Sequence, residues 1–237
     1  MNKNDLISII QTYCRENANS ENALKSNRYF KEAINSYGLT TPQITDKTKD
    51  LLKSGQLSLN TVLQAAPVLL KSEKYEEISF GLLLINGFEK QYSKPLFDEI
   101  GTWFAYSIHN WAHADTLGMF ILPKFTKNRI IQLEDFKPWL ISPYKFQRRC
   151  VPVTLIKSLK TSPDFNSIFR FVEPLVMDPV REVHQGVGWF LREAWKKKRE
   201  ETEAFLLKWK DRAPRLIIQY ATEKMTPEEK LRFRRAK

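Results

Sequence analysis

Helical periodicity along almost the whole chain limits this sequence to an all-α fold. Apolar residues recur at spacings of three and four, as in Leu6, Ile9 and Tyr13, and clean alternation of apolar and polar residues is rare. Prolines fall mostly between the periodic segments, where the chemistry of helix starts and stops places them. The chain has only eight glycines, so long flexible linkers are not expected.

The pattern divides the chain into short helices with little sequence between them. Helices are expected over 4–18, 21–36, 42–54, 57–71, 73–91, 95–107, 111–125, 128–141, 144–160, 164–176, 179–197, 200–211, 213–224 and 226–235. Paired short helices of this kind indicate an α-solenoid of HEAT-like repeats, a curved array whose inner face usually binds the partner. We expect one such domain over residues 1–237; a compact, non-repeating helical bundle is the alternative.

Charge and cysteine content narrow the classes of function. The formal net charge of +11 and the pI near 9.6 favour polyanionic partners, nucleic acid first and an anionic membrane second. The longest apolar runs, such as 80–85, are too short to span a bilayer, and no signal peptide is evident at the N-terminus. Cys14 and Cys150 belong to no CxxC pattern, which argues against a disulfide scaffold or a cysteine zinc site. We therefore expect a soluble, cytoplasmic protein.

One short stretch in the middle of the chain carries the first candidate site. Trp111 and Asp115 lie four residues apart, so a helix that starts here presents a flat ring and a carboxylate on one face. A core tryptophan beside a solvated or capping carboxylate is the alternative. His109 and His113 share this spacing, which also fits two zinc ligands, but Asn110 stands where a metalloprotease motif has its glutamate. We expect no metal, and place both histidines beside a phosphate path or in a helix cap.

Two later stretches combine positive charge with aromatic side chains. Residues 144–149, Tyr-Lys-Phe-Gln-Arg-Arg, follow a proline at an expected helix start, and helix N-termini and arginines both suit phosphate oxygens. An ordinary solvated basic face is the alternative. Residues 181–195 contain Gly186 and Gly188 beside Trp189. Each glycine costs a helix about 1 kcal/mol relative to alanine, so we expect either close helix packing or space cleared for a ligand beside Trp189.

Four short motifs occur in a specific order, although each is weak alone. They are Arg28-Tyr29 with Gly38 and Thr41-Pro42, Asn110-Trp111 with Asp115, Gln147-Arg148-Arg149, and Gly188-Trp189 with Leu191-Arg192-Glu193. With this order, and over about residues 22–225, the chain resembles the AlkD-type DNA alkylation-repair proteins, which are HEAT-like-repeat alkylpurine DNA glycosylases. The resemblance implies a curved α-solenoid of antiparallel helix pairs with a concave basic face that binds DNA.

The resemblance also implies roles for individual residues. Asp115 is similar to the family's essential carboxylate, and Trp111 and Trp189 are similar to the aromatics that contact the deoxyribose and backbone of the lesion. Arg149 is similar to the phosphate-contacting arginine, with Arg148 as the second candidate. The residues expected to contact DNA are Tyr29, His109, His113, Lys145, Arg148, Arg149 and Gln185. The chain departs from the family at Asn110, where an aromatic residue is common, and at Gln185, where lysine is common.

The implied function is a monofunctional DNA glycosylase acting on duplex DNA that contains N3- or N7-alkylated purines. Such an enzyme needs no metal or cofactor and is expected to act as a monomer. The family engages the backbone of the lesion and leaves the base largely outside a tight pocket, so an open basic cleft is expected at Asp115. A carboxylate buried in the core would rule this hypothesis out. A non-catalytic HEAT-like module that binds bent, branched or damaged DNA is the alternative, and a protein-binding scaffold is a third.

Overall fold

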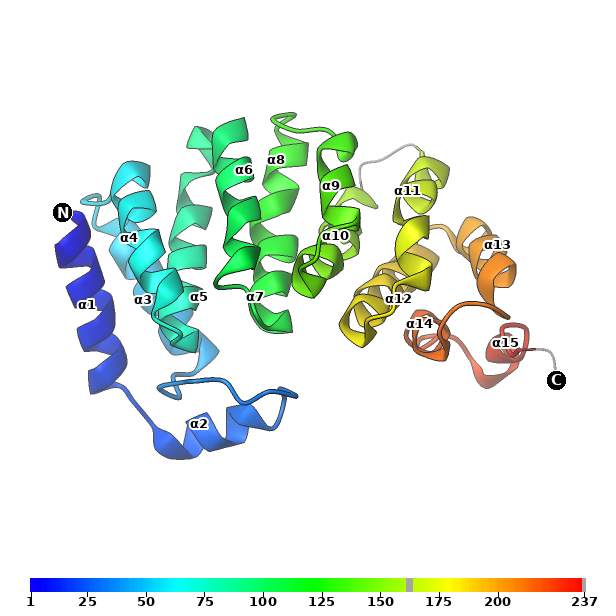
Figure 1. The fold of residues 1–237 in the computed structure, drawn as a ribbon, viewed down its shortest axis with the longest axis horizontal. Coiled ribbons are helices and arrows are strands. Elements are labelled where there is room, and N and C mark those ends of the chain that lie inside the picture. Colours follow the sequence, from blue (N-terminus) through cyan, green and yellow to red (C-terminus); the bar gives the residue numbers. More distant parts are fainter. Residues whose placement is uncertain (161–163, 236–237) are drawn as a thin grey trace. The chain divides into compact units, whose positions relative to one another are not determined.

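The computed structural model describes residues 1–160 and 164–235, and these residues form helices without a named strand (Figure 1). The α-helices are α1 (Lys3–Glu16), α2 (Ser20–Asn27), α3 (Thr41–Lys53), α4 (Leu59–Lys71), α5 (Tyr75–Ile85), α6 (Lys94–Thr102), α7 (Trp111–Thr116), α8 (Leu122–Lys127), α9 (Lys137–Leu140), α10 (Lys145–Ser158), α11 (Phe165–Val172), α12 (Arg181–Trp195), α13 (Arg199–Trp209), α14 (Arg215–Ala221) and α15 (Pro227–Leu231). The all-α prediction is confirmed.

Short non-α turns extend or join these helices. The 3-10 segments are η1 (Asn86–Gln91), η2 (Trp103–Ala105), η4 (Leu133–Phe136) and η5 (Glu173–Met177), and η3 (Leu117–Ile121) is a π-helical segment between α7 and α8. Contacts within the chain define two compact units, which we call unit 1 (Met1–Thr116) and unit 2 (Leu117–Lys237). Each unit has a core of its own and is described separately.

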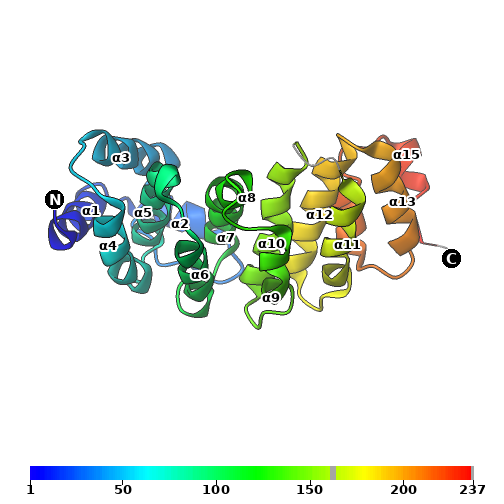
Figure 2. The ribbon, with the colours of Figure 1, turned by 90° about the horizontal axis from the view of Figure 1, so that it is seen from above.

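Unit 1 is built on α1, α3, α4 and α5. Helix α4 packs against both α1 and α5, and α3 packs against α5. The periodic apolar faces seen in the sequence meet here, because Leu6 and Ile10 of α1, Leu69 and Leu70 of α4, and Phe80 of α5 are fully buried. Figure 2 shows α1, α3, α4 and α5 grouped together, seen from above. Helix α6 continues the unit and leads into α7.

Helix α2 and the loop that follows it differ from the expected helix over 21–36. The helix ends at Asn27, whose Oδ1 accepts a hydrogen bond from the Ile34 backbone N–H (2.6 Å), so the chain turns back on itself. The loop closes at Gly38, whose φ of +85° suits glycine and where a Cβ would lie 2.0 Å from the Asn19 carbonyl oxygen. No residue of α2 is buried, and α2 lies apart from the other helices of unit 1 in Figure 1.

Unit 2 is organised around α12, which packs against α10 on one side and α14 on another. A Cβ on Gly186 would lie 3.1 Å from the Arg149 carbonyl oxygen of α10, and one on Gly188 would lie 2.5 Å from Tyr220 Cβ of α14. Both glycines therefore serve close helix packing, the first of the two roles expected for them. Only the later part of the segment 128–141 is helical. Arg129, two residues after the end of α8, has a φ of +57°, which does not fit an α-helix. Helical turns resume only in η4 and α9.

Among the described residues, none of the helices has both the length and the apolar character needed to cross a membrane.

Candidate functional site

Asn110 holds the start of α7, the helix that carries the first candidate site. Its Oδ1 accepts a hydrogen bond from the His113 backbone N–H (2.9 Å), which is the arrangement of a helix N-cap. Its Nδ2 lies 2.9 Å from Nδ1 of the His113 ring. One side chain thus satisfies both a free backbone donor of the first turn and a buried ring nitrogen.

Trp111 and Asp115 lie one turn apart on α7, as their spacing predicts. Trp111 is 39% exposed and Asp115 is half-buried, so the carboxylate does not lie in the core. The Trp111 ring is held from one side by the loop after α2. Its Nε1 donates to the Tyr29 carbonyl oxygen (3.3 Å), and the Phe30 ring stacks on it with centroids 5.4 Å apart. The indole is therefore exposed but fixed in orientation.

The π-helical segment η3 follows α7 immediately. A π-turn inserts an extra residue per turn into a helix, and such turns are frequent at functional sites. Pro123 occupies the first turn of α8, just after η3, and has no N–H for a bond to a preceding carbonyl. Residues 111–125, predicted as one helix, thus change winding directly after Asp115.

His113 faces the interior of unit 1 and is only 1% exposed. Its Nε2 lies 3.0 Å from the Tyr75 carbonyl oxygen and 3.2 Å from Ser79 Oγ, and its ring stacks on Tyr75 at 4.6 Å. Burial lowers the pKa of the imidazole to about 4, so the ring is neutral. The expectation that His113 contacts DNA is wrong, because both ring nitrogens are taken by the protein. Of the two roles considered for it, the helix cap is the correct one.

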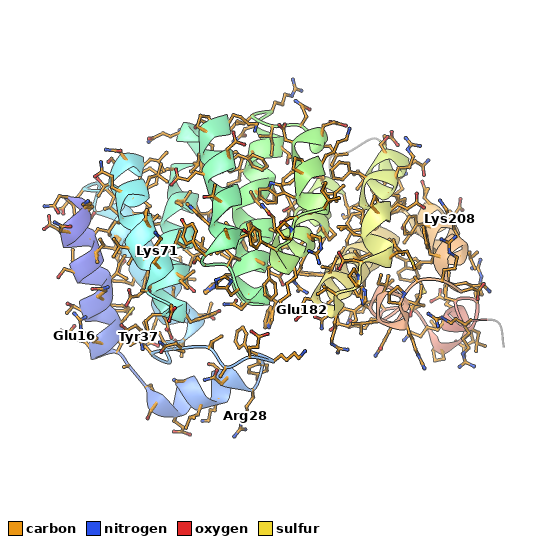
Figure 3. The ribbon with its side chains drawn as sticks, in the orientation of Figure 1. Glu16, Arg28, Tyr37, Lys71, Glu182 and Lys208 are labelled. Carbon is orange, nitrogen blue, oxygen red and sulfur yellow. The ribbon has the colours of Figure 1, made fainter. Side chains whose placement is uncertain are left out.

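Tyr29 and His109 remain at the surface of unit 1. Tyr29 is 77% exposed and follows Arg28, which projects away from α2 in Figure 3. His109 is exposed as well. Both residues have the accessibility that a contact with DNA requires, so that role stays a prediction for each of them.

Arg148, in α10 of unit 2, is committed to the interior of its own unit. Its Nε donates to Asp178 Oδ2 (2.6 Å), its Nη2 donates to Asp178 Oδ1 (3.3 Å), and its Nη1 donates to the Ser142 carbonyl oxygen (2.6 Å). The two side chains are 12% and 6% exposed. Removing one partner from a buried bidentate pair costs about 3–5 kcal/mol. The expectation that Arg148 contacts a phosphate is therefore wrong, because its donors already brace the start of α10.

Arg149 and Lys145 lie on the same helix, in different environments. Arg149 is buried, with 6% of its surface exposed, and its Nη1 donates to the Glu182 carbonyl oxygen (2.9 Å). Lys145 is half-buried, with its Nζ 3.2 Å from Glu182 Oε1. The phosphate contacts expected of both residues stay predictions.

Gln185 and Trp189 lie one turn apart on α12, the same spacing as Trp111 and Asp115 on α7. Both are half-buried, and Gln185 Nε2 donates to Tyr220 Oη (3.0 Å). Gly188 lets α14 approach α12 closely beside Trp189. The side chains of unit 2 thus give α12 a partly exposed polar and aromatic face.

Sequence reasoning missed the residues that support α7. The helix predicted over 21–36 includes Phe30, and nothing in the local sequence marks this residue as a partner of Trp111, which lies 81 positions later. Tyr75 was likewise unmarked. Asn110 did carry a signal, because asparagine directly before a helical segment is a strong N-cap residue.

The chain is similar to known proteins in both sequence and fold. The family model described as DNA alkylation repair enzyme matches residues 10–225. A solved structure described as a predicted DNA alkylation repair enzyme from Enterococcus faecalis is similar, with a TM-score of 0.75 and 15% sequence identity over 89% of this chain and 97% of that chain. The likeness supports an α-solenoid type of fold. No curated protein matches the chain.

Proposed function

Since the chain belongs to the DNA alkylation repair enzyme family and DNA is thereby its partner, we propose that it is a monofunctional DNA glycosylase. Its substrate would be duplex DNA with N3- or N7-alkylated purines. The observation that carries the proposal is the pairing of an exposed Trp111 with a half-buried Asp115, one turn apart on α7. A tryptophan and a carboxylate so arranged can contact one sugar residue together.

The chemistry of the substrate explains why one carboxylate suffices. Alkylation at N3 or N7 gives the purine a positive charge. When the C1′–N bond breaks, its electron pair moves to the ring and the base leaves as a neutral molecule, without a general acid. Positive charge then builds on the sugar, as in other glycosyl transfers. Water adds to C1′ and loses a proton, which leaves an abasic site.

Asp115 would act on the sugar rather than on the base. A carboxylate near C1′ stabilises the oxocarbenium-like transition state and orients the attacking water. Trp111, and Trp189 of unit 2, would contact the deoxyribose and backbone of the lesion. An aromatic face attracts a cation with about 0.5–2 kcal/mol, which favours the alkylated nucleoside over a neutral one. The base would remain outside a tight pocket during the reaction.

Binding to DNA would rest on the excess of positive charge and on the accessible residues Tyr29, His109, Lys145 and Gln185. Arg149, which is 6% exposed, would contribute a phosphate contact from α10. Phosphate contacts release counterions, so affinity would fall steeply with salt. We expect the protein to work as a cytoplasmic monomer without a metal or cofactor.

Base release from a duplex with one N7-methylguanine tests the proposal. Wild type is compared with Asp115→Asn, which keeps the size of the side chain and removes its charge, and with Glu134→Gln as a matched exposed control. We expect rapid release by wild type and control, and release at least 100-fold slower in Asp115→Asn with DNA binding retained. Salt-sensitive binding without release by wild type would favour the non-catalytic DNA-binding module. Equal release by all three proteins would show that Asp115 is not the catalytic group.

A further inference from the structure

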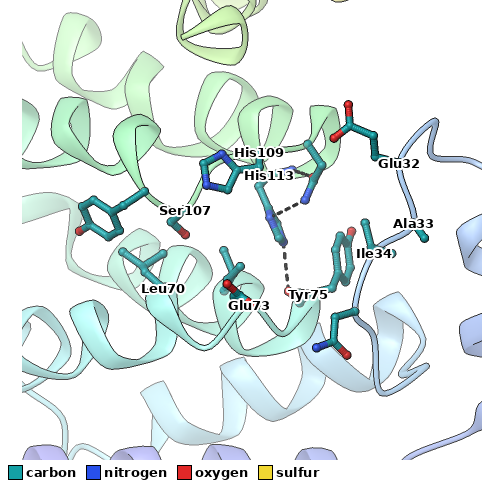
Figure 4. Close-up of a pocket in the computed structure, with 13 residues that line it drawn as sticks. Glu32, Ala33, Ile34, Leu70, Glu73, Tyr75, Ser107, His109 and His113 are labelled. Atoms are coloured by element: carbon teal, nitrogen blue, oxygen red, sulfur yellow. Dashed lines mark hydrogen bonds between the residues drawn. The ribbon is translucent and has the colours of Figure 1, made fainter.

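Unit 1 contains a cavity of about 290 Å³ that the proposed reaction does not use (Figure 4). His109, Asn110 and His113 of the α7 region line it, so it borders one residue proposed to contact DNA, whereas Trp111 and Asp115 do not line it. In a helix with 3.6 residues per turn, His113 and Asp115 point in roughly opposite directions. The cavity and the Trp111–Asp115 pair therefore lie on different faces of α7, and the cavity is a separate site.

The walls of the cavity are rich in hydrogen-bond acceptors and flat rings. Glu32 and Glu73 supply carboxylates, Asn35 supplies an amide, and Tyr75 and Tyr106 supply aromatic rings, while no lysine or arginine is among the described lining residues. In a chain of net charge +11, such a wall is unusual. It suits a small ligand with several N–H donors or a positive charge, rather than a phosphate.

One buried hydroxyl indicates a built site rather than a packing defect. Ser107 lines the cavity and is 4% exposed, and its Oγ has no hydrogen-bond partner in the part of the chain that the structure describes. Buried hydroxyls are nearly always paired, so an orphan one at a cavity wall points to a partner that comes from outside. Glu73, whose φ is +60°, follows the C-cap of α4, and a left-handed residue is common at this position.

The walls are also held in place before any ligand arrives. Tyr75 is stacked on the His113 ring at 4.6 Å. Lys74 Nζ donates to Asn35 Oδ1 (2.7 Å), and Lys71 Nζ lies 5.3 Å from the centre of the Tyr106 ring. A preorganised wall loses little side-chain freedom on binding, which favours affinity for a small ligand.

We propose that this cavity binds a free alkylated purine base. Its volume accommodates one small ring system, and its two carboxylates would repel the phosphate of a nucleotide. The amino and ring N–H groups of a purine would donate to the carboxylates and the amide oxygen, and a ring nitrogen would accept from Ser107 Oγ. Alkylation of a ring nitrogen makes the base easier to protonate, which the two glutamates favour. The identity of the base as a reaction product rests on the proposed function.

Titration of the ¹⁵N-labelled protein with 3-methyladenine, followed by NMR, tests this site directly. Adenine serves as the less basic purine and adenosine monophosphate as the phosphate-bearing control. The variants are Ser107→Ala, which removes only the orphan hydroxyl and leaves packing intact, and Glu73→Gln, which removes charge at constant size. Glu16→Gln is the matched control, because Glu16 is an exposed glutamate of unit 1 that does not line the cavity.

We expect the NMR signals of Ser107 and Asn110 to shift saturably with 3-methyladenine. Adenine should bind at least fivefold more weakly, and adenosine monophosphate should not bind. Ser107→Ala and Glu73→Gln should each weaken the binding of 3-methyladenine at least fivefold, and Glu16→Gln should leave it unchanged. Absence of saturable shifts, or equal affinity in all variants, would overturn the proposal. If wild type releases N7-methylguanine but 3-methyladenine does not bind, only the cavity assignment fails. If 3-methyladenine binds but no base is ever released from DNA, the glycosylase proposal fails and the assignment to a product falls with it.

Discussion

Replacing Asn110 by alanine removes both hydrogen bonds that fix the start of α7. Loss of the N-cap bond to the His113 backbone N–H costs about 1 kcal/mol. The second loss leaves His113 Nδ1 without a donor inside unit 1, and an unsatisfied buried acceptor costs about 1–3 kcal/mol. We therefore expect the free energy of unfolding to fall by about 2–4 kcal/mol, well above the usual effect of a change at a partly exposed position.

Urea unfolding measures this loss, and two further variants divide it. Asn110→Ser keeps an oxygen that can cap the helix but is too short to reach the His113 ring. Its free energy of unfolding should therefore fall only by the contribution of the lost hydrogen bond to His113 Nδ1. Asn110→Asp keeps the cap and places a second acceptor beside Nδ1. The His113 ring would then have to bind a proton to make that bond, so the His113 pKa should rise from its depressed value.

The same variants report on function, because α7 carries Trp111 and Asp115. Single-turnover release of N7-methylguanine should slow in Asn110→Ala even under conditions where the protein stays folded. A stability loss below about 0.5 kcal/mol in Asn110→Ala, which is the range of neutral surface changes, would refute the view that this side chain holds the helix. So would equal losses in the alanine and serine variants together with an unchanged His113 pKa in Asn110→Asp.

Three other perturbations have defined outcomes. The buried His113 ring stays neutral down to a pH of about 4, whereas in the unfolded chain it binds a proton below about pH 6.5. The free energy of unfolding should therefore fall by about 3 kcal/mol as the pH drops from 6.5 to about 4. Urea titrations at each pH should show this decrease in wild type and not in His113→Gln. Gly188→Ala should lower the free energy of unfolding by about 2 kcal/mol, because the new Cβ clashes with Tyr220 Cβ. Gly81→Ala, whose Cβ would meet nothing closer than 3.6 Å, should leave the stability unchanged or raise it. Equal thermal midpoints for the two variants would contradict this. Phe30→Ala should slow single-turnover base release up to about tenfold by freeing the Trp111 ring, and an unchanged rate would show that the stacking does not matter.

Local patterns in the sequence were enough for the all-α class, for many of the helices and for the shared face of Trp111 and Asp115. The spacing of Trp111 and Asp115 determines their shared face once the segment is helical, whatever the rest of the chain does. Likewise, α3 begins at Thr41, one residue before the predicted start at residue 42, with Thr40 as its N-cap and Pro42 in its first turn. Such features depend on neighbours within one helical turn, which a single sequence displays directly.

Long-range polar contacts could not be anticipated in this way. Arg148 looked like a phosphate ligand, because nothing near it in the sequence shows that Asp178, 30 positions later, satisfies its guanidinium. The loop after α2 is a second case. Its end is held by Glu76, a fully buried carboxylate that accepts hydrogen bonds from the Tyr37 and Gly38 backbone N–H groups (2.9 and 2.8 Å). The partners come from another helix, so helical periodicity alone extended the segment too far.

Asn110 determines how α7 is held rather than which side chains the helix presents to solvent. A helix of six residues has too few internal hydrogen bonds to be stable alone, so contacts with the rest of unit 1 must fix it. Asn110 and His113 supply those contacts on the inner face, and Phe30 supplies one on the Trp111 ring. An aromatic residue in place of Asn110 would have to replace a cap and a buried hydrogen bond by packing alone. Because Trp111 and Asp115 point the other way, the choice at position 110 alters the rigidity of the pair while leaving its chemistry unchanged.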